Sequence, residues 1–297
     1  MRLENLKRPS GVVNAVLDTD TYNEIDDQFA LAYFMLSPEK INPLAVYAAP
    51  FANQNAANPA EGMERSYEEI QRVLTHCGKA GFPAYRGSKT YLPDEKTPVE
   101  SEAARDLIKR ALEHTPEKPL YVLTIGCITN IASALLIEPA IRDRIVIIWL
   151  GGQAHSWSNL HWAEFNMVQD IAAARVVFNS GAALVQLPCM GVVSHLMTTE
   201  PELRQHCKGK SALGDYLYDI TCKAAIHDGG NETWSRVIWD ISVVAWLMGE
   251  DFVKDAIVPT PLPSYDNGYL HDPRRHLMSV AYFVSRDVIF KDLFGKI

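Results

Sequence analysis

Short apolar runs alternate with longer segments of helical spacing along most of the chain. The apolar runs predict buried strands, and the spacing of apolar residues in the longer segments predicts helices. Such alternation, with β-branched residues in the strands, is typical of a parallel sheet covered by helices on both faces. We therefore expect one α/β domain over residues 1–297, with an open, mostly parallel sheet flanked by helices and a Rossmann-like core. Strands are predicted at 12–17, 41–49, 119–125, 141–152, 182–189 and 276–283, a loop at 50–62, and helices at 28–36, 63–79, 101–115, 126–137, 169–181, 201–207, 211–226 and 239–249.

Four aspartates follow the first predicted strand within ten positions, at Asp18, Asp20, Asp26 and Asp27. Like charges this close repel one another and raise one another's pKa values. A hard divalent cation would relieve the repulsion, because such ions prefer carboxylate and other oxygen ligands. An aspartate helix cap and a polar turn would account for one or two of the four, but not for all. Because ligands of open α/β sheets bind beyond the carboxyl ends of the strands, this stretch predicts a metal site.

The proposed ligand set is Asp20, Asp26 and Asp27. Three carboxylates alone leave a Ca²⁺ site short of its usual shell of about six to eight oxygens. The carbonyl of Ile125, which ends a predicted strand, is one further candidate. Asp240 opens a strongly apolar segment, and the sequence leaves open whether it is a plain helix cap or another ligand.

Polar loop residues supply candidates for substrate binding. Glu164 and Asn166 follow a Gly-Gly strand end, where a carboxylate and an amide could bind the vicinal hydroxyls of a sugar; a solvated loop is the alternative, and Asn53 has the same status. Three loop histidines could act as general acids, although each could equally be a solvated side chain. Two loop tryptophans could stack on a heterocycle. These five residues are His155, His161, His227, Trp157 and Trp162.

Composition and charge exclude several classes of protein. The net charge of −8 and the pI near 5.6 argue against a nucleic-acid-binding surface. Five scattered cysteines without CxxC spacing indicate reduced thiols, and hence a cytoplasmic location. The N-terminal segment lacks the apolar core of a signal peptide, and no apolar run reaches the length of a membrane span. The motifs of nucleotide-phosphate loops, zinc proteases and serine hydrolases are absent.

Four blocks of the chain, in order from residue 12 to about 250, carry a family resemblance. They are DTDTYNEIDD, LTIGCITNIASAL, WLGG with the AEFN and Asp170 that follow it, and WDISVVAWL. Together they resemble the calcium-dependent, inosine-uridine preferring nucleoside hydrolases. The resemblance implies the nucleoside hydrolase fold, a small-molecule nucleoside substrate and a homodimer or homotetramer. It also implies hydrolysis of the N-glycosidic bond to ribose and free base, with a Ca²⁺-bound water as the nucleophile.

The resemblance assigns roles position by position. Asp20 would ligate Ca²⁺ and act as the base that activates water, while Asp27, Ile125 and Asp240 would complete the metal site. Asp26 would hydrogen-bond the ribose, and Asp18 would support the ligands from behind. Ribose hydroxyls would also be bound by Asn53, Glu164 and Asn166.

Two departures from the family pattern affect these assignments. The acidic motif is two residues longer, which leaves open whether Asp18 or Asp20 is the base. Trp239 stands where the family has a histidine that assists the leaving group. Trp239 could stack on the base instead, and His227 or His161 could donate the proton. Alternative functions are hydrolysis of a non-standard N-riboside or another glycoside, or Ca²⁺ and ribose binding with weak catalysis.

Overall fold

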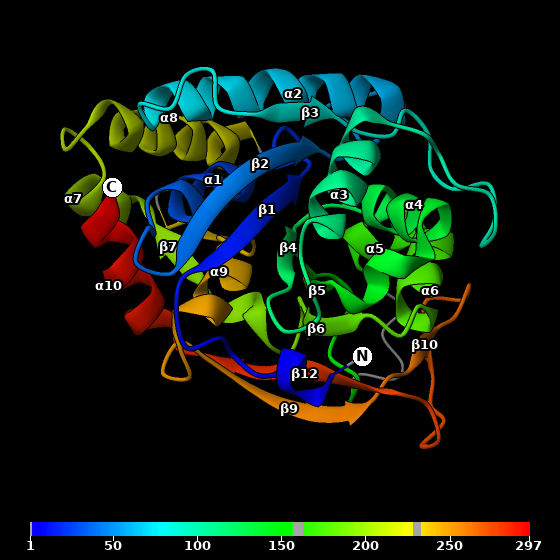
Figure 1. Ribbon diagram of the computed structural model, residues 1–297. Coiled ribbons are helices and arrows are strands. Elements are labelled where there is room, and N and C mark those ends of the chain that lie inside the picture. Colours follow the sequence, from blue (N-terminus) through cyan, green and yellow to red (C-terminus); the bar gives the residue numbers. More distant parts are fainter. Residues whose placement is uncertain (1, 157–162, 228–232) are drawn as a thin grey trace.

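The predicted sheet is confirmed in the computed structural model, which describes residues 2–156, 163–227 and 233–297. Eight strands form one sheet in the order β3-β2-β1-β4-β5-β6-β12-β9 (Figure 1). All neighbouring pairs are parallel except β12 and β9. The strands are β1 (Val13–Thr19), β2 (Ile41–Ala48), β3 (Ala84–Arg86), β4 (Leu120–Thr124), β5 (Ile145–Leu150), β6 (Ala183–Leu187), β9 (Val253–Pro259) and β12 (Leu277–Val284).

Helices pack on both faces of this sheet because the central strands are apolar on both sides. In β5, Val146 and Ile148 belong to one hydrophobic core, whereas Ile147 and Trp149 belong to the other. The first core lies under α1 (Asp26–Met35), α2 (Pro59–His76), α8 (Ala212–His227), α9 (Ile241–Met248) and α10 (Arg286–Lys296). The second lies under α3 (Glu102–Leu112), α4 (Thr129–Ile137) and α6 (Ile171–Asn179), on the other side of the sheet in Figure 1.

Several predicted boundaries were wrong. Strand β1 continues to Thr19, so Asp18 lies inside the strand and not beyond it. Helix α2 begins at Pro59, inside the predicted loop 50–62, because the Asn58 side chain caps it by accepting a hydrogen bond from the Glu61 amide at 3.0 Å. His227 closes helix α8 and does not lie in a polar loop.

Short and edge strands were also missed. Neither β3, which has three residues, nor the edge strand β9 shows the long apolar pattern that predicts a buried strand. Two further pairs of strands were not predicted. They are β7 (Met197–Thr199) with β8 (Ser235–Val237), and β10 (Leu262–Pro263) with β11 (Tyr269–Leu270).

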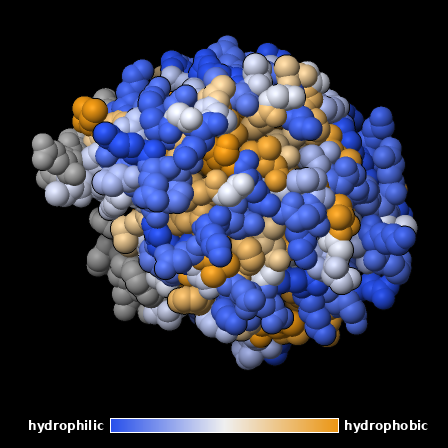
Figure 2. All heavy atoms as spheres, turned by 90° about the vertical axis from the view of Figure 1, so that its left-hand side faces the viewer, coloured by the Kyte–Doolittle hydropathy of each residue, from blue (hydrophilic) through white to orange (hydrophobic). Residues whose placement is uncertain are grey.

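One face of the molecule is mainly polar (Figure 2). Figure 2 shows the face that carries α7 (Glu200–His206) and α10, where hydrophilic side chains surround smaller apolar patches. Within the described part of the chain, no helix has both the length and the apolar character needed to cross a membrane.

Candidate active site

The acidic stretch lies at the carboxyl end of the central strand β1, where the topology predicts a ligand site. Asp18 is in β1, Asp20 follows the strand, and Asp26 and Asp27 are the first two residues of α1. All four are buried, with relative exposures of 4% or less. Burial of four carboxylates without a compensating cation is energetically unfavourable, so the arrangement indicates a site for a positive ion.

Asp26 and Asp27 meet a third carboxylate, that of Asp240. Each of these three residues offers one oxygen atom, and the three oxygens lie within 4.8 Å of one another. Asp240 immediately precedes α9 but makes no capping hydrogen bond to it. Its carboxylate is therefore available to the cluster, and the ligand interpretation of Asp240 is favoured over the helix-cap interpretation. Converging carboxylate oxygens of this kind suit a hard divalent cation.

Asp18 and Asp20 differ in their hydrogen bonds. The Asp18 carboxylate accepts from Asn130 Nδ2 at 2.8 Å and from Thr124 Oγ1 at 3.3 Å. Neither oxygen of Asp20 has a hydrogen-bond partner within the described residues, although both are buried. Gly126 leaves room for this group, because a Cβ there would lie 3.0 Å from the Asp20 carboxylate. Of Asp18 and Asp20, it is thus Asp20, just beyond the end of β1, whose oxygens remain available for a ligand.

The cluster holds its carboxyl groups at strongly raised pKa values. Burial raises the pKa of both Asp18 and Asp27 from 3.8 to about 7, although hydrogen bonds from Asn130 and Thr19 act in the opposite direction. Burial, followed by the charge of a neighbouring carboxylate, raises the pKa of Asp20, Asp26 and Asp240 well above the ordinary value. Without a cation, several of these groups therefore retain protons near neutral pH.

These shifts predict how pH changes the stability of the metal-free protein. A carboxyl group with a raised pKa binds its proton more tightly when folded, so its stabilising effect is complete below pH 3.8 and is lost as the pH rises through about 7. In excess chelator, we expect the melting temperature to fall by at least about 5 °C between pH 5 and pH 8. Saturating Ca²⁺ should remove most of this fall. Thermal melts across this pH range, with and without the ion, measure both effects. If the melting temperature fell equally with pH in chelator and in Ca²⁺, the prediction would be contradicted.

A second wall of the site is built from α5 (Phe165–Gln169) and the ends of β4 and β5. Asn166 Nδ2 donates to the carbonyl of Ile125 at 2.8 Å and to that of Leu150 at 3.0 Å. Glu164 caps α5: its carboxylate accepts from the amides of Gly152 at 2.6 Å, Asn166 at 2.8 Å and Met167 at 2.9 Å. The Ile125 carbonyl keeps a second lone pair. The wall therefore presents one carbonyl, one amide and one carboxylate beside the aspartate cluster.

A cavity of about 250 Å³ separates the two walls. Trp239 also lines it, and its backbone amide donates to Asp26 at 3.1 Å. Asn23 and Glu24, which belong to the longer turn, lie at the same cavity. The structure thus brings most of the predicted site residues together. Those lining the cavity are Asp26, Asp27, Ile125, Glu164, Asn166, Trp239 and Asp240.

Asn53 is placed differently from the other candidates. Its side-chain amide donates to Asn23 Oδ1 at 2.6 Å, and its side-chain oxygen accepts from the Asn55 amide at 2.7 Å. Asn55 Nδ2 in turn donates to the Asn23 carbonyl at 2.9 Å. Asn53 is not among the residues that line the 250 Å³ cavity, and its described contacts hold the long turn in place. A ribose contact for Asn53 stays a prediction.

The candidate acids and stacking residues in the loops are only partly described. His155 lies in a second cavity, beside Tyr269 and not with the aspartates. His227 is the last residue of α8, but its side chain lies outside the described part of the structure. His161, Trp157 and Trp162 also lie outside the described residues.

Several residues to which the sequence assigned no role hold the site from behind. Thr19 Oγ1 donates to Asp27 at 2.5 Å, and Asn130 bridges Asp18 to the carbonyl of Ala48. Asp170 accepts hydrogen bonds from Thr129 Oγ1 at 2.7 Å and from the Leu92 amide at 2.8 Å. Thr129 and Asn130 directly follow a predicted strand and its glycine turn, which is the signal that could have identified them.

A family model and curated relatives match most of the chain. The model described as inosine-uridine preferring nucleoside hydrolase matches residues 15–280. An inosine-uridine preferring nucleoside hydrolase of Leishmania major is 35% identical over 228 residues, which cover 76% of this chain and 71% of that protein. A non-specific ribonucleoside hydrolase of Salmonella paratyphi B is 25% identical over 256 residues, covering 80% and 78% of the two chains.

Solved structures share the fold over almost the whole chain. A plant nucleoside hydrolase superposes with a TM-score of 0.78 at 19% identity, covering 96% of this chain and 98% of that one. A purine-preferring ribonucleoside hydrolase from Gardnerella vaginalis gives a TM-score of 0.77 at 20% identity, covering 95% and 97%. At these identities the likeness concerns the architecture.

Proposed function

The chain belongs to the inosine-uridine preferring nucleoside hydrolase family, and we propose that its aspartate cluster binds Ca²⁺ for the family's reaction. The protein is an enzyme that hydrolyses the N-glycosidic bond of ribonucleosides, releasing ribose and a free base. The observation that carries the metal proposal is the pair of buried oxygens of Asp20, which have no hydrogen-bond partner among the described residues. The charges of Asp26 and Asp27, two members of the neighbouring carboxylate cluster, act on this group. Buried anions without partners require a cation or a proton.

The donor set fits Ca²⁺ better than a softer metal. Asp20, Asp27 and Asp240 would hold the ion with carboxylate oxygens, and Ile125 would add a carbonyl oxygen. No cysteine or histidine is part of the described cluster, and all-oxygen coordination suits a hard cation. When bound, such an ion lowers the pKa of a water molecule and fixes adjacent sugar hydroxyls.

Asp20 is the proposed general base. Its oxygens are free to accept a proton from the attacking water, whereas those of Asp18 already accept hydrogen bonds from Asn130 and Thr124. Asp18 instead supports the end of β1. Water attacks the anomeric carbon as the bond to the base breaks, and positive charge develops on the sugar as in other glycoside hydrolyses.

The second wall would position the sugar. Asp26, Asn166 and Glu164 line the cavity and would bind ribose hydroxyls, with Asn53 as a further predicted contact. The carboxylate of Glu164 already accepts three backbone hydrogen bonds, which fix its orientation. A sugar hydroxyl would therefore meet a preorganised acceptor, so little additional ordering is needed on binding.

The leaving base would meet Trp239. Trp239 lines the cavity together with Asp26 and Asp240, and its indole would stack on the heterocycle. The proton for the base is assigned to His227, which ends α8. Replacing His227 with alanine tests this assignment by itself, because unchanged turnover of every nucleoside would exclude His227 as the acid.

Turnover of a nucleoside panel, with and without chelator, tests the whole proposal. We expect ribose and free base from at least one of inosine, uridine, adenosine and cytidine, with activity lost in excess chelator and restored by Ca²⁺. The product analysis separates the alternatives, because ribose binding without turnover would indicate a binding protein. Turnover that is indifferent to chelator, in protein that contains no bound Ca²⁺, would contradict the metal proposal.

We also propose a homodimer or homotetramer in the cytoplasm. All five cysteines are free thiols, which supports a reducing compartment. Light scattering coupled to size-exclusion chromatography measures the assembly directly, and a purely monomeric mass would exclude it.

A further inference from the structure

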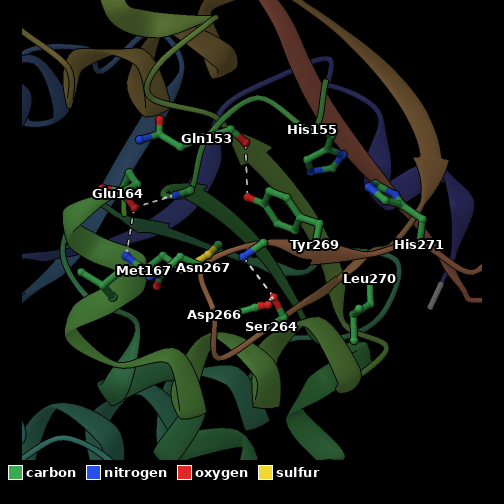
Figure 3. A pocket seen from close by; sticks show the side chains of 13 residues that line it. Gln153, His155, Glu164, Met167, Ser264, Asp266, Asn267, Tyr269, Leu270 and His271 are labelled. Carbon is green, nitrogen blue, oxygen red and sulfur yellow. Dashed lines mark hydrogen bonds between the residues drawn. The ribbon is translucent and has the colours of Figure 1, made fainter. Parts of the chain in front are cut away.

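A second cavity, of about 260 Å³, lies beside the proposed sugar site (Figure 3). Its walls are the loop after β5, the start of α5 and the β10–β11 hairpin. Gln153 and Glu164 line both cavities, so the two are neighbours that share part of a wall. Hydrolysis as proposed above uses none of the other residues that line this second cavity.

Three residues with aromatic rings line this cavity: His155, Tyr269 and His271. The ring centroids of His155 and Tyr269 are 4.7 Å apart, those of His155 and His271 are 5.9 Å apart, and those of Tyr269 and His271 are 6.4 Å apart. The planes meet at 57°, 67° and 50°, so the rings are not stacked on one another. Figure 3 shows them as neighbours on one side of the cavity. At these separations the three rings pack against one another and form one aromatic surface, on which Tyr269 supplies the ring that attracts cations most strongly.

The charge at the cavity is negative. Glu164 and Asp266 contribute carboxylates, and the described lining contains neither lysine nor arginine. Burial lowers the pKa of His155, so this imidazole is neutral at pH 7. Its Nε2 lies 2.8 Å from Gln186 Oε1, which can only accept, so Nε2 carries the hydrogen and Nδ1 is an acceptor.

Hydrogen bonds fix the shape of the cavity. Gln186 Nε2 donates to the Tyr269 hydroxyl at 2.8 Å, and this hydroxyl donates to the carbonyl of Gln153 at 3.3 Å. Gly152 has a φ of +75°, and a Cβ there would overlap the Tyr269 hydroxyl. The hairpin and the loop after β5 are thus locked together, and the cavity is preformed. Preformed cavities with a few convergent polar groups are typical of small-molecule sites.

We propose that this cavity binds a small organic cation that carries a primary ammonium group. The ammonium would lie against the aromatic rings of His155, Tyr269 and His271, with Asp266 and Glu164 as its counter-charges. An anion would meet two carboxylates and no cationic side chain among the described lining residues. A neutral alcohol of the same size would gain neither the attraction of the rings nor that of the carboxylates.

Such an ammonium group can come from two sources. It can belong to a separate small molecule, or it can be a substituent on the sugar of a ribonucleoside. The second source is sterically reasonable because Gln153 and Glu164 border both cavities. Both sources share one recognition chemistry, and binding and kinetic measurements distinguish them.

Titration calorimetry with n-butylammonium, with 1-butanol as the neutral control, tests the site without any turnover. We expect the cation to bind the wild-type protein at least about tenfold more tightly than the alcohol. Asp266→Asn and His271→Leu should each weaken cation binding by at least about threefold. Asp272→Asn removes a neighbouring carboxylate that does not line the cavity, and it should leave binding unchanged.

Equal affinity for the cation and the alcohol would overturn the proposal, as would equal affinities in wild type and Asp266→Asn. Loss of hydrolysis alone would not overturn the proposal, because the calorimetry is independent of turnover. Unchanged turnover of the parent nucleoside by Asp266→Asn and His271→Leu would show that both variants remain folded.

Kinetics with a 5′-amino-5′-deoxyribonucleoside identify the source of the ammonium group. If the substrate supplies it, the amino compound should have a lower KM than its parent, and Asp266→Asn should raise only the KM of the amino compound. If a separate molecule supplies it, the two compounds should have equal KM values, and n-butylammonium should bind with the same affinity at saturating substrate. Either result supports the site, whereas failure of both amines to bind would exclude it.

Discussion

Asp20→Asn should reduce kcat by roughly 10²- to 10⁴-fold, the usual contribution of a general base. The change keeps the size of the side chain but removes its ability to take a proton from water. The KM for the nucleoside should change far less, because Asp20 does not line the sugar cavity. Steady-state kinetics at saturating Ca²⁺ measure both constants. A kcat within a factor of five of the wild-type value would exclude Asp20 as the base.

Asp18→Asn is the matched control for this variant. It changes the same side chain two residues earlier, but each oxygen of Asp18 already accepts a hydrogen bond, one from Thr124 and one from Asn130. We expect a loss of stability of about 1–3 kcal/mol, because a buried, hydrogen-bonded carboxylate is replaced. The kcat of the folded variant should fall much less than that of Asp20→Asn. If kcat fell more in Asp18→Asn than in Asp20→Asn, Asp18 would be the base.

Asp240→Ala should weaken Ca²⁺ binding by at least about 100-fold and abolish most turnover at micromolar Ca²⁺. The variant removes one of three converging carboxylates, the one that immediately precedes α9 and lies far along the chain from the other two. Part of the turnover should return at millimolar Ca²⁺, because the remaining ligands still form a weaker site. Calorimetric titration with Ca²⁺ and turnover as a function of Ca²⁺ concentration are the two measurements.

Ser242→Ala, two residues after Asp240 in the first turn of α9, provides a control. The Ser242 hydroxyl is buried and has no hydrogen-bond partner within the described residues, so its removal should change neither Ca²⁺ affinity nor turnover. Asp240→Ala with wild-type Ca²⁺ affinity would mean that Asp240 is not a ligand. Equal losses of Ca²⁺ affinity in Asp240→Ala and Ser242→Ala would instead indicate a general disturbance of α9.

The buried part of the fold could be predicted from the sequence because its signal is local. Strands β1, β4, β5 and β6 are apolar on both sides, so each stands out from its neighbours without knowledge of the tertiary structure. Strand β9 is different, because only one of its seven residues is fully buried. Its extended conformation depends on pairing with β12, and this partner cannot be identified from the pattern of β9 itself.

The acidic half of the site could also be predicted, because four carboxylates close in sequence are conspicuous. The hydrogen bonds that hold the site from behind could not. Asn130 lies more than a hundred residues from Asp18, and only the parallel pairing of β1 with β4 brings them together. The position of Asn53 depends on a turn that departs from the family motif, so the resemblance could assign it a role but not its contacts.

The turn between Asp20 and Asp26, which the family resemblance makes two residues longer than the motif, is held separately from the carboxylates at its ends. Its two ends belong to separate rigid elements, β1 and α1, and Asn53 and Asn55 fasten its middle. Residues can therefore be added between the ends without displacing the carboxylates, while Asn23 and Glu24 reach the mouth of the cavity. Changes in this turn would thus alter the lining of the cavity and leave the positions of the aspartates unchanged.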